Sequence, residues 1–324
     1  MLRLSTKQVN RLASLAIIPL MALAIVFGSR FASSSASKAD PPREGVLVIA
    51  NLRAESLTFL DLEHAARRDL GLPGPPHELV SAGSRLYATL GRADSLVEVE
   101  PRSPGILRTL HLDGEPHGLA LDTSANLVVT LDKANTLVAI DRATLTETSR
   151  ESTGDTPHTV AFADGVAYVT ASRAAMLQAL PGSRSAPTGA MPESVTVAGR
   201  FVVTADADAG TLSVFDRATL TPVRTINVGA RPVRVVALDD THVLATINGA
   251  ARLVLVDIAT GNVQKRIETL GHPDGICLSP SRGYVAVASN ESDAVQVFRR
   301  SDWALAATLE AADGPGSCLW LPSF

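Results

Sequence analysis

A proline at the head of a short apolar run recurs seven times along this chain of 324 residues. Successive prolines are 40, 41, 35, 40, 41 and 42 residues apart. A fixed period of this size is typical of repeat architectures, in which each unit packs against its neighbours. The period therefore predicts a single repeat domain. The prolines are Pro76, Pro116, Pro157, Pro192, Pro232, Pro273 and Pro315.

Each period carries three further β-forming runs after the proline-led run. In the clearest period, runs at residues 201–204, 211–215 and 223–228 are rich in Val, Thr and Leu and have the length of strands. A turn that begins at an aspartate, here Asp216, follows the third strand, because an aspartate side chain accepts hydrogen bonds from the backbone after it. Four antiparallel strands per unit of this size form one blade of a β-propeller. The sequence predicts an all-β, seven-bladed β-propeller.

The count of units predicts how the ring closes. Six complete units run from Pro76 to about residue 312. Residues 45–74 supply three strands without a first strand, and residues 314–321 supply a first strand alone. We expect these fragments to form the seventh blade together, so that pairing of the N- and C-terminal strands closes the ring.

The first 36 residues differ from the rest of the chain. Arg3, Lys7 and Arg11 precede an uncharged stretch of 17 residues at 12–28, and small polar residues follow it. This order is typical of a secretory signal peptide, and the stretch is slightly shorter than the roughly 20 residues that span a bilayer. We expect residues 1–36 to be a signal peptide or an N-terminal membrane anchor, residues 37–44 a linker and residues 45–324 the propeller. The protein is therefore predicted to be exported, as a periplasmic or envelope-associated protein.

Several runs resemble the repeats of the YVTN-type, YncE-like β-propeller family. The matching segments are residues 167–170 (Ala-Tyr-Val-Thr), 201–204 (Phe-Val-Val-Thr), 211–216 (Thr-Leu-Ser-Val-Phe-Asp) and 225–232 (Thr-Ile-Asn-Val-Gly-Ala-Arg-Pro). The chain lacks the recurring Gly-His and Trp-Asp pairs of WD40 repeats. The resemblance covers residues 45–322 and implies an exported propeller of the cell envelope. The motifs build blades, so they imply no particular activity.

Reading one residue past each proline around the ring gives the candidate site. These residues should lie at one level near the mouth of the channel, and a cluster of histidines with carboxylates could bind a ligand, hold a divalent metal or transfer protons. The alternative is that they only bond neighbouring loops and channel water. The ligand-binding candidates are His77, His117, His158, Glu193 and Asp274, and the metal candidates are His77, His117, His158 and Glu193. Val233 and Gly316 complete the register.

One short segment favours an enzyme. Glu115-Pro116-His117-Gly118 resembles a pattern of streptogramin B lyases, propellers in which a histidine acts as general base and a glutamate helps to bind magnesium. On this reading His117, His158 and Glu115 would be the catalytic residues of a metal-dependent lyase or lactonase. No second motif supports it, and no cofactor is predicted beyond a possible divalent metal.

Two cysteines lie in first strands of neighbouring blades, Cys277 four residues after its proline and Cys318 three residues after its own. A disulfide there would lock the closure of the ring in an oxidising compartment. Residues at odd and even positions of a strand point to opposite faces, and on that basis we expect two buried free thiols instead.

Charge and composition exclude one class of partner. The net charge of −4 and the pI near 6.0 give no basic surface for nucleic acid. We expect a monomer that contacts a membrane only through an uncleaved N-terminal anchor. The leading hypothesis is an exported, non-catalytic module that binds a small ligand or a cell-envelope protein. A structural component of the envelope is a third alternative.

Overall fold

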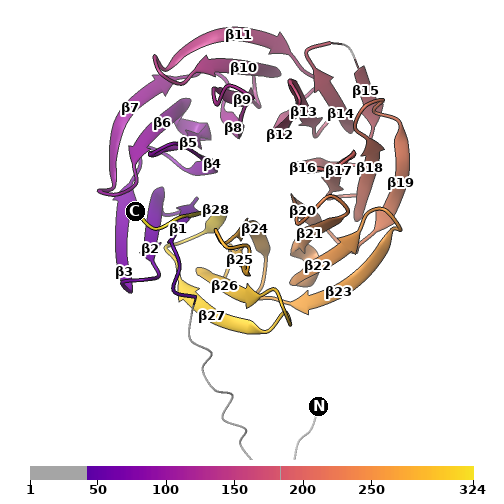
Figure 1. Ribbon diagram of the computed structural model, residues 1–324. Helices are drawn as coiled ribbons and strands as arrows, with labels where there is room; N and C mark the ends of the chain where they lie inside the picture. Colours follow the sequence, from indigo (N-terminus) through magenta and orange to yellow (C-terminus); the bar gives the residue numbers. More distant parts are fainter. Residues whose placement is uncertain (1–41, 183) are drawn as a thin grey trace, which may run out of the picture. The chain divides into compact units, whose positions relative to one another are not determined.

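The strands of the computed structural model surround a central axis (Figure 1). The structure describes residues 42–182 and 184–324. Within these ranges 28 strands form seven sheets of four antiparallel strands, and the only helical elements are the short 3-10 turns η1 (Gly91–Ala93) and η2 (Asn248–Ala250). The predicted seven-bladed propeller is confirmed.

The blades are numbered from the first complete unit, and each runs from the channel outward. Blade 1 holds β4 (Pro76–Ala82), β5 (Arg85–Leu90), β6 (Ser95–Glu100) and β7 (Gly105–His111). Blade 2 holds β8 (Pro116–Leu121), β9 (Leu127–Leu131), β10 (Thr136–Asp141) and β11 (Thr146–Ser152). Blade 3 holds β12 (Pro157–Ala163), β13 (Val166–Ala171), β14 (Met176–Leu180) and β15 (Arg184–Pro187).

The remaining blades follow the same order. Blade 4 holds β16 (Pro192–Ala198), β17 (Phe201–Asp206), β18 (Thr211–Asp216) and β19 (Pro222–Asn227). Blade 5 holds β20 (Pro232–Ala237), β21 (His242–Ile247), β22 (Arg252–Asp257) and β23 (Asn262–Glu268). Blade 6 holds β24 (Pro273–Leu278), β25 (Tyr284–Ser289), β26 (Ala294–Arg299) and β27 (Leu305–Glu310). Blade 7 holds β28 (Pro315–Leu321), β1 (Val46–Asn51), β2 (Ser56–Asp61) and β3 (Ala66–Gly71).

The core lies between blades. The inner strands bury side chains on both faces because each blade has a neighbour on either side. On β17, for example, Val203 packs with residues of blade 5 such as Val243, whereas Val202 packs toward blade 3 against Tyr168. The fourth strands are mostly exposed, as β11 shows. The near-continuous apolar runs of the second and third strands reflect this two-sided burial.

The predicted closure is also confirmed. β28 pairs with β1 in the sheet order β28-β1-β2-β3, with Val46 opposite Leu321 and Ile49 opposite Cys318 (Figure 1). The indole N–H of Trp320 donates a hydrogen bond to the carbonyl of Glu44 at 2.8 Å. Both ends of the propeller are therefore held in one backbone ladder.

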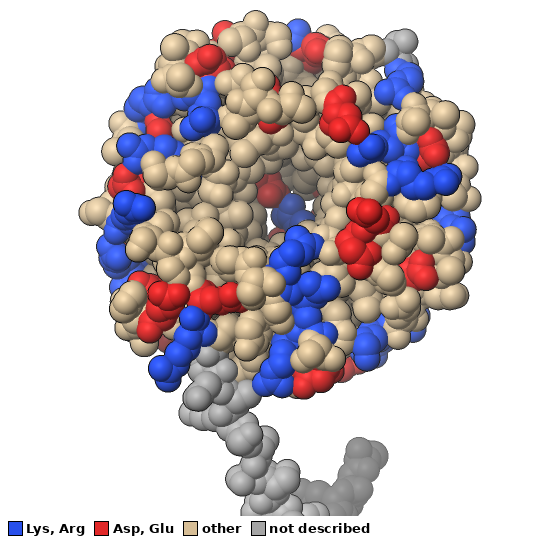
Figure 2. Space-filling model, in the orientation of Figure 1, with Lys and Arg blue, Asp and Glu red and all other residues tan. Residues whose placement is uncertain are grey.

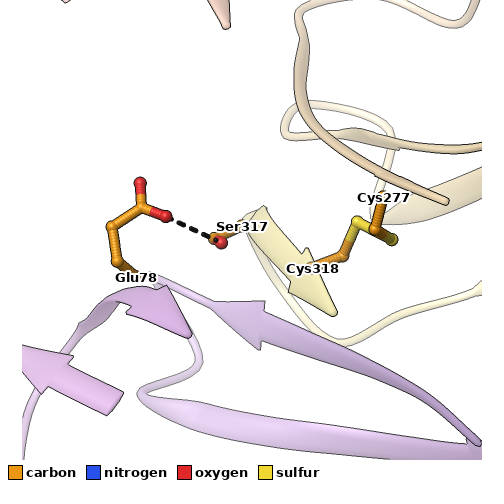
Figure 3. The surroundings of a disulfide bond; sticks show 4 residues. All are labelled: Glu78, Cys277, Ser317 and Cys318. Carbon is orange, nitrogen blue, oxygen red and sulfur yellow. Dashed lines mark hydrogen bonds between the residues drawn. A yellow bond between two sulfur atoms is a disulfide. The ribbon is translucent and has the colours of Figure 1, made fainter. Parts of the chain in front are cut away.

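The prediction of free thiols is wrong. Cys277 and Cys318 form a disulfide between β24 and β28, with Cα atoms 5.8 Å apart (Figure 3). The two residues do lie on opposite faces of their own blades. Adjacent blades meet through opposite faces, so this arrangement directs both side chains into the same contact between blades 6 and 7.

The domain boundaries at the N-terminus stay a prediction. The proposed signal peptide or anchor at residues 1–36, and most of the linker at 37–44, lie outside the described residues. Among the residues that are described, none belongs to a helix with the length and apolar character that a membrane crossing requires.

Removing the disulfide should weaken the folded state. Cys277 and Cys318 are 41 residues apart in sequence, and a cross-link over such a loop contributes about 4 kcal/mol through the entropy of the unfolded chain. We expect the Cys277→Ser/Cys318→Ser variant to lose about 2–4 kcal/mol of unfolding free energy in chemical denaturation. Reductant should destabilise the wild type to a similar degree and leave the double variant unchanged. Equal stability of oxidised and reduced wild type would contradict this.

Candidate functional site

Three histidines from consecutive blades stack at the proline end of the channel. His77, His117 and His158 each follow the first proline of β4, β8 and β12. The ring centroids of His77 and His117 are 4.4 Å apart, and those of His117 and His158 are 3.9 Å apart. The register read past each proline thus brings these three candidates into direct contact.

Backbone hydrogen bonds hold two of the rings. The Nδ1 of His117 lies 3.1 Å from the carbonyl oxygen of His158, and the Nδ1 of His158 lies 2.7 Å from the carbonyl oxygen of Glu193. A carbonyl can only accept, so each Nδ1 carries the proton. In the neutral ring, Nε2 is then an acceptor. The ring of His77 makes no hydrogen bond to any described residue.

A buried threonine of the second strand positions the neighbouring histidine. Thr89 Oγ1 accepts from the N–H of Glu78 at 3.1 Å and lies 2.6 Å from the carbonyl oxygen of His117 on the next blade. Thr130 repeats this bridge to the carbonyl of His158 at 2.9 Å. The first strands carry one extra residue after the proline, and the threonine satisfies the backbone there. Sequence reasoning missed this role, although a threonine recurs at the matching position of several second strands.

Burial keeps the stacked histidines neutral. It lowers the pKa of His77, lowers the pKa of His117 well below its usual range, and lowers the pKa of His158 to about 4. The neighbouring imidazoles add to the effect on His117, because protonating one ring disfavours protonating the next. At neutral pH the stack therefore offers uncharged acceptor nitrogens.

The carboxylates of the register lie on the other side of the ring and are engaged with arginines. Glu193 Oε1 lies 3.2 Å from Arg231 Nη2, and both residues stand next to the first proline of their blades. Burial raises the pKa of Glu193, against the opposing effect of the nearby arginine. Asp274 Oδ1 lies 3.5 Å from Arg234 Nη2. Neither carboxylate makes a hydrogen bond through its side chain to a histidine of the stack.

Arg234 crosses the channel. It extends from blade 5 to an ion pair with Glu78 of blade 1, 156 residues away in sequence, and Ser317 Oγ donates to the same carboxylate at 3.3 Å (Figure 3). Burial alone would lower the pKa of Arg234. The nearby carboxylates of Glu78 and Asp274 have the larger combined effect and raise this pKa above its ordinary value. Acidic and basic side chains are visible inside the channel in Figure 2. The sequence analysis considered only the residue directly after each proline. It therefore missed Glu78, Arg234 and Ser317, which all stand two residues after a proline.

A cavity of about 190 Å³ lies along the channel at this ionic cluster. Its lining combines Glu78 and Arg234 with hydroxyls such as Ser194 and with aliphatic side chains such as Val160. The Nε of Arg234 is buried without a hydrogen-bond partner among the described residues. His77, His117 and His158, which follow the prolines by one residue rather than two, are not among the residues that line this cavity.

The metal and catalytic candidates are not assembled as a metal site. Within residues 42–182 and 184–324, no group of three or more His, Cys, Asp and Glu side chains is placed to hold a metal ion. The carboxylate of Glu115 lies 4.0 Å from Lys133 Nζ and makes no hydrogen bond to His117 or His158. The segment Glu115-Pro116-His117-Gly118 therefore does not join its glutamate to the histidine stack.

Comparison with known proteins supports the fold. No protein-family model and no curated protein matches the sequence. A functionally unknown protein from Desulfotomaculum acetoxidans superimposes with a TM-score of 0.73 at 12% identity, covering 86% of this chain and all of the other. A streptogramin B lyase matches with a TM-score of 0.67 at 13% identity over 78% of this chain and 91% of its own. Apo AztD from Citrobacter koseri matches with a TM-score of 0.65 at 10% identity over 85% and 97%. At these identities the likeness shows a shared propeller fold alone.

Breaking the ion pair across the channel should destabilise the ring. Arg234→Ala leaves Glu78 and Asp274 without their cation in a largely buried place, which we expect to cost about 3 kcal/mol of unfolding free energy. The matched control is Arg231→Ala, whose side chain is 51% exposed and whose ion pair should contribute less than about 1 kcal/mol. Chemical denaturation measures both variants. Equal losses of unfolding free energy in the two variants would show that the ion pair across the channel stabilises the fold no more than an exposed ion pair does.

The histidine stack should make the protein less stable in acid. Between the ordinary pKa of 6.5 and the lowered value of about 4, the unfolded chain protonates His158 while the folded protein does not. Stability should therefore fall as the pH drops through this window, by up to about 1.4 kcal/mol per pH unit for each such histidine. Glu193 partly offsets this loss of stability. Burial raises its pKa, so the folded protein binds a proton at Glu193 at a higher pH than the unfolded chain does.

His158→Asn tests this dependence. An asparagine can keep a donor near the position of Nδ1 but cannot titrate, so the slope of unfolding free energy against pH should become shallower. His272→Asn, an exposed histidine paired with Glu291, serves as the control. An unchanged slope in His158→Asn would be evidence against a neutral buried ring at this position.

Proposed function

We propose that this protein is an exported, YVTN/YncE-like propeller that binds a small ligand or a cell-envelope protein at the proline end of its channel, without catalysis. The repeat motifs that carry the family resemblance fall on regular blade strands, as residues 211–216 do on β18. The shared propeller fold agrees with this assignment. The ligand would contact the mouth formed by His77, His117, His158, Glu193 and Asp274.

The state of the histidine stack carries the proposal. His117 and His158 donate through Nδ1 to backbone carbonyls and stay neutral, so each has an Nε2 acceptor fixed in place. Fixed acceptors suit recognition of hydrogen-bond donors, since little freedom is lost on binding. A general base at neutral pH needs a pKa close to the working pH, and that of His158 is about 4. The fixed acceptors and the lowered pKa values of the stacked histidines therefore support binding rather than proton transfer.

The disulfide supports export. Disulfides persist in oxidising compartments such as the bacterial periplasm and are rare in the cytosol. The Cys277–Cys318 bond lies beside the ladder that closes the ring, where it stabilises the fold. Together with the charged and apolar N-terminal sequence, it favours a periplasmic or envelope-associated protein.

The metal-dependent lyase or lactonase has no comparable support. In such an enzyme a histidine would act as general base beside a metal-binding carboxylate, but the carboxylate of Glu115 lies beside Lys133 and no group of three or more potential ligands is placed to hold a metal ion among the described residues. The likeness to a streptogramin B lyase is one of fold at 13% identity. We therefore keep binding as the single proposed function.

A ligand screen with matched variants tests the proposal. We expect a compound from a panel of amino acids, sugars, organic acids and amines to raise the melting temperature of the wild type. This shift should disappear in His117→Asn/His158→Asn and persist in His272→Asn. Elemental analysis of protein purified without chelator should find no stoichiometric divalent metal. Turnover of the bound compound that is abolished by His117→Asn, or bound metal lost in the double variant, would favour the enzyme instead.

A further inference from the structure

A second concave site adjoins the histidine stack at the seam between blades 7 and 1. Six residues line this pocket of about 350 Å³, which is within the size range of small-molecule sites. They come from the turn after β1, the segment before β4, the start of β4 and the turn η1. They are Leu52, Arg53, Glu55, Pro75, His77 and Arg92.

Two opposite charges in this pocket have no partner. Arg92 and Glu55 each make no ion pair and no side-chain hydrogen bond within the described part of the chain, and they do not pair with each other. Arg53 is different, because its Nε lies 2.6 Å from Asp313 and its Nη1 donates to Asn290 at 2.6 Å. The pocket therefore offers one available cation and one available anion, with the third charge already neutralised.

The other walls are apolar or can form neutral hydrogen bonds. Leu52 and Pro75 supply aliphatic surface, and His77 is the one ring of the stack without a hydrogen bond to a described residue. A side chain at Gly91 would bring its Cβ within 2.9 Å of His77 Nε2, so a glycine at the start of η1 leaves room for this ring. His77 therefore lines the pocket beside a glycine that leaves room for its ring.

The same turn on other blades shows what is particular to this pocket. The second residue of the turn between the second and third strands is Arg92 in blade 1 and Arg173 in blade 3. Arg173 is exposed and has no ion-pair partner in the described residues, yet it does not line the pocket. Arg173 is therefore a matched control for Arg92.

From these walls we propose that the pocket binds a zwitterionic α-amino acid. Its carboxylate pairs with Arg92 and its ammonium group pairs with Glu55. Its side chain packs on Leu52 and Pro75, and a ring nitrogen of His77 forms a hydrogen bond with one of the two charged groups on the α-carbon. Arginine is suited to a carboxylate because its planar guanidinium can donate two parallel hydrogen bonds. This inference rests on the proposed binding role of the mouth, because His77 belongs to both sites, and it names the ligand class of the adjoining pocket.

The backbone at Glu55 allows a variant that separates binding from folding. Glu55 adopts a left-handed conformation with φ of 46°. Asparagine tolerates this region better than most residues do. Glu55→Asn should therefore fold at least as stably as the wild type while lacking the charge for an ammonium group.

Three probes of matched shape test the ligand class by calorimetric titration of the intact protein. They are L-leucine, 4-methylpentanoate, which lacks the ammonium group, and 3-methylbutylamine, which lacks the carboxylate. We expect L-leucine to bind at least about tenfold more tightly than either analogue. Arg92→Gln and Glu55→Asn should each weaken leucine binding about tenfold, whereas Arg173→Gln should leave it unchanged. Glu55→Asn should keep or raise the melting temperature.

Several results would overturn the inference. These are equal affinities for leucine and its two analogues, unchanged leucine affinity in both Arg92→Gln and Glu55→Asn, an equal loss in Arg173→Gln, or no binding of leucine at about 10 mM. If another ligand binds and is lost only in His117→Asn/His158→Asn, the mouth is a binding site and the zwitterion pocket alone is wrong.

Discussion

The backbone ladder between β28 and β1 is the constraint on which the rest of the structure depends. Six blades are each continuous in sequence, but blade 7 takes its innermost strand from one end of the chain and its three outer strands from the other. Without that pairing, blades 6 and 1 would each expose an apolar face to water. The Cys277–Cys318 disulfide ties β28 to blade 6, so backbone hydrogen bonds and a covalent bond hold the same seam.

Closure has a direct consequence for the channel. A closed ring places seven first strands around one axis, and their prolines set a common level for the residues that follow. The bulge after each proline and the buried threonine bridges, such as Thr89 to the carbonyl of His117, fix that level from blade to blade. The histidine stack is thus a product of ring geometry, since its three members come from three blades.

The charged and titratable side chains of the channel follow two registers, which the ion pair between Asp274 and Arg234 joins. The residues one position after the prolines form the mouth, with neutral histidines on blades 1 to 3 and carboxylates on blades 4 and 6. Two positions after the prolines, Arg234 of blade 5 and Glu78 of blade 1 form an ion pair across the channel. Burial explains both registers, because a buried imidazole loses its proton, whereas a guanidinium keeps its charge and must be paired.

The sequence by itself determined the architecture. The proline period, the strand-length runs and the two partial units at the chain ends were enough for seven blades, for the order of strands and for closure, because each follows from local pattern and counting. The same register identified His77, His117, His158, Glu193 and Asp274 as candidate residues of the mouth, since strands that begin at equivalent prolines place the following residue at the same level.

Only the tertiary structure decided which side chains meet. It showed that opposite faces of neighbouring blades bring Cys277 and Cys318 together, that Arg234 reaches Glu78 across the ring, and that Glu115 lies beside Lys133 and apart from the histidines. Contacts of this kind depend on distances between blades and on the directions of side chains, and a period along one chain does not contain them. The repeating prolines therefore specify where the candidate site lies, and the packing of the blades specifies which side chains meet there.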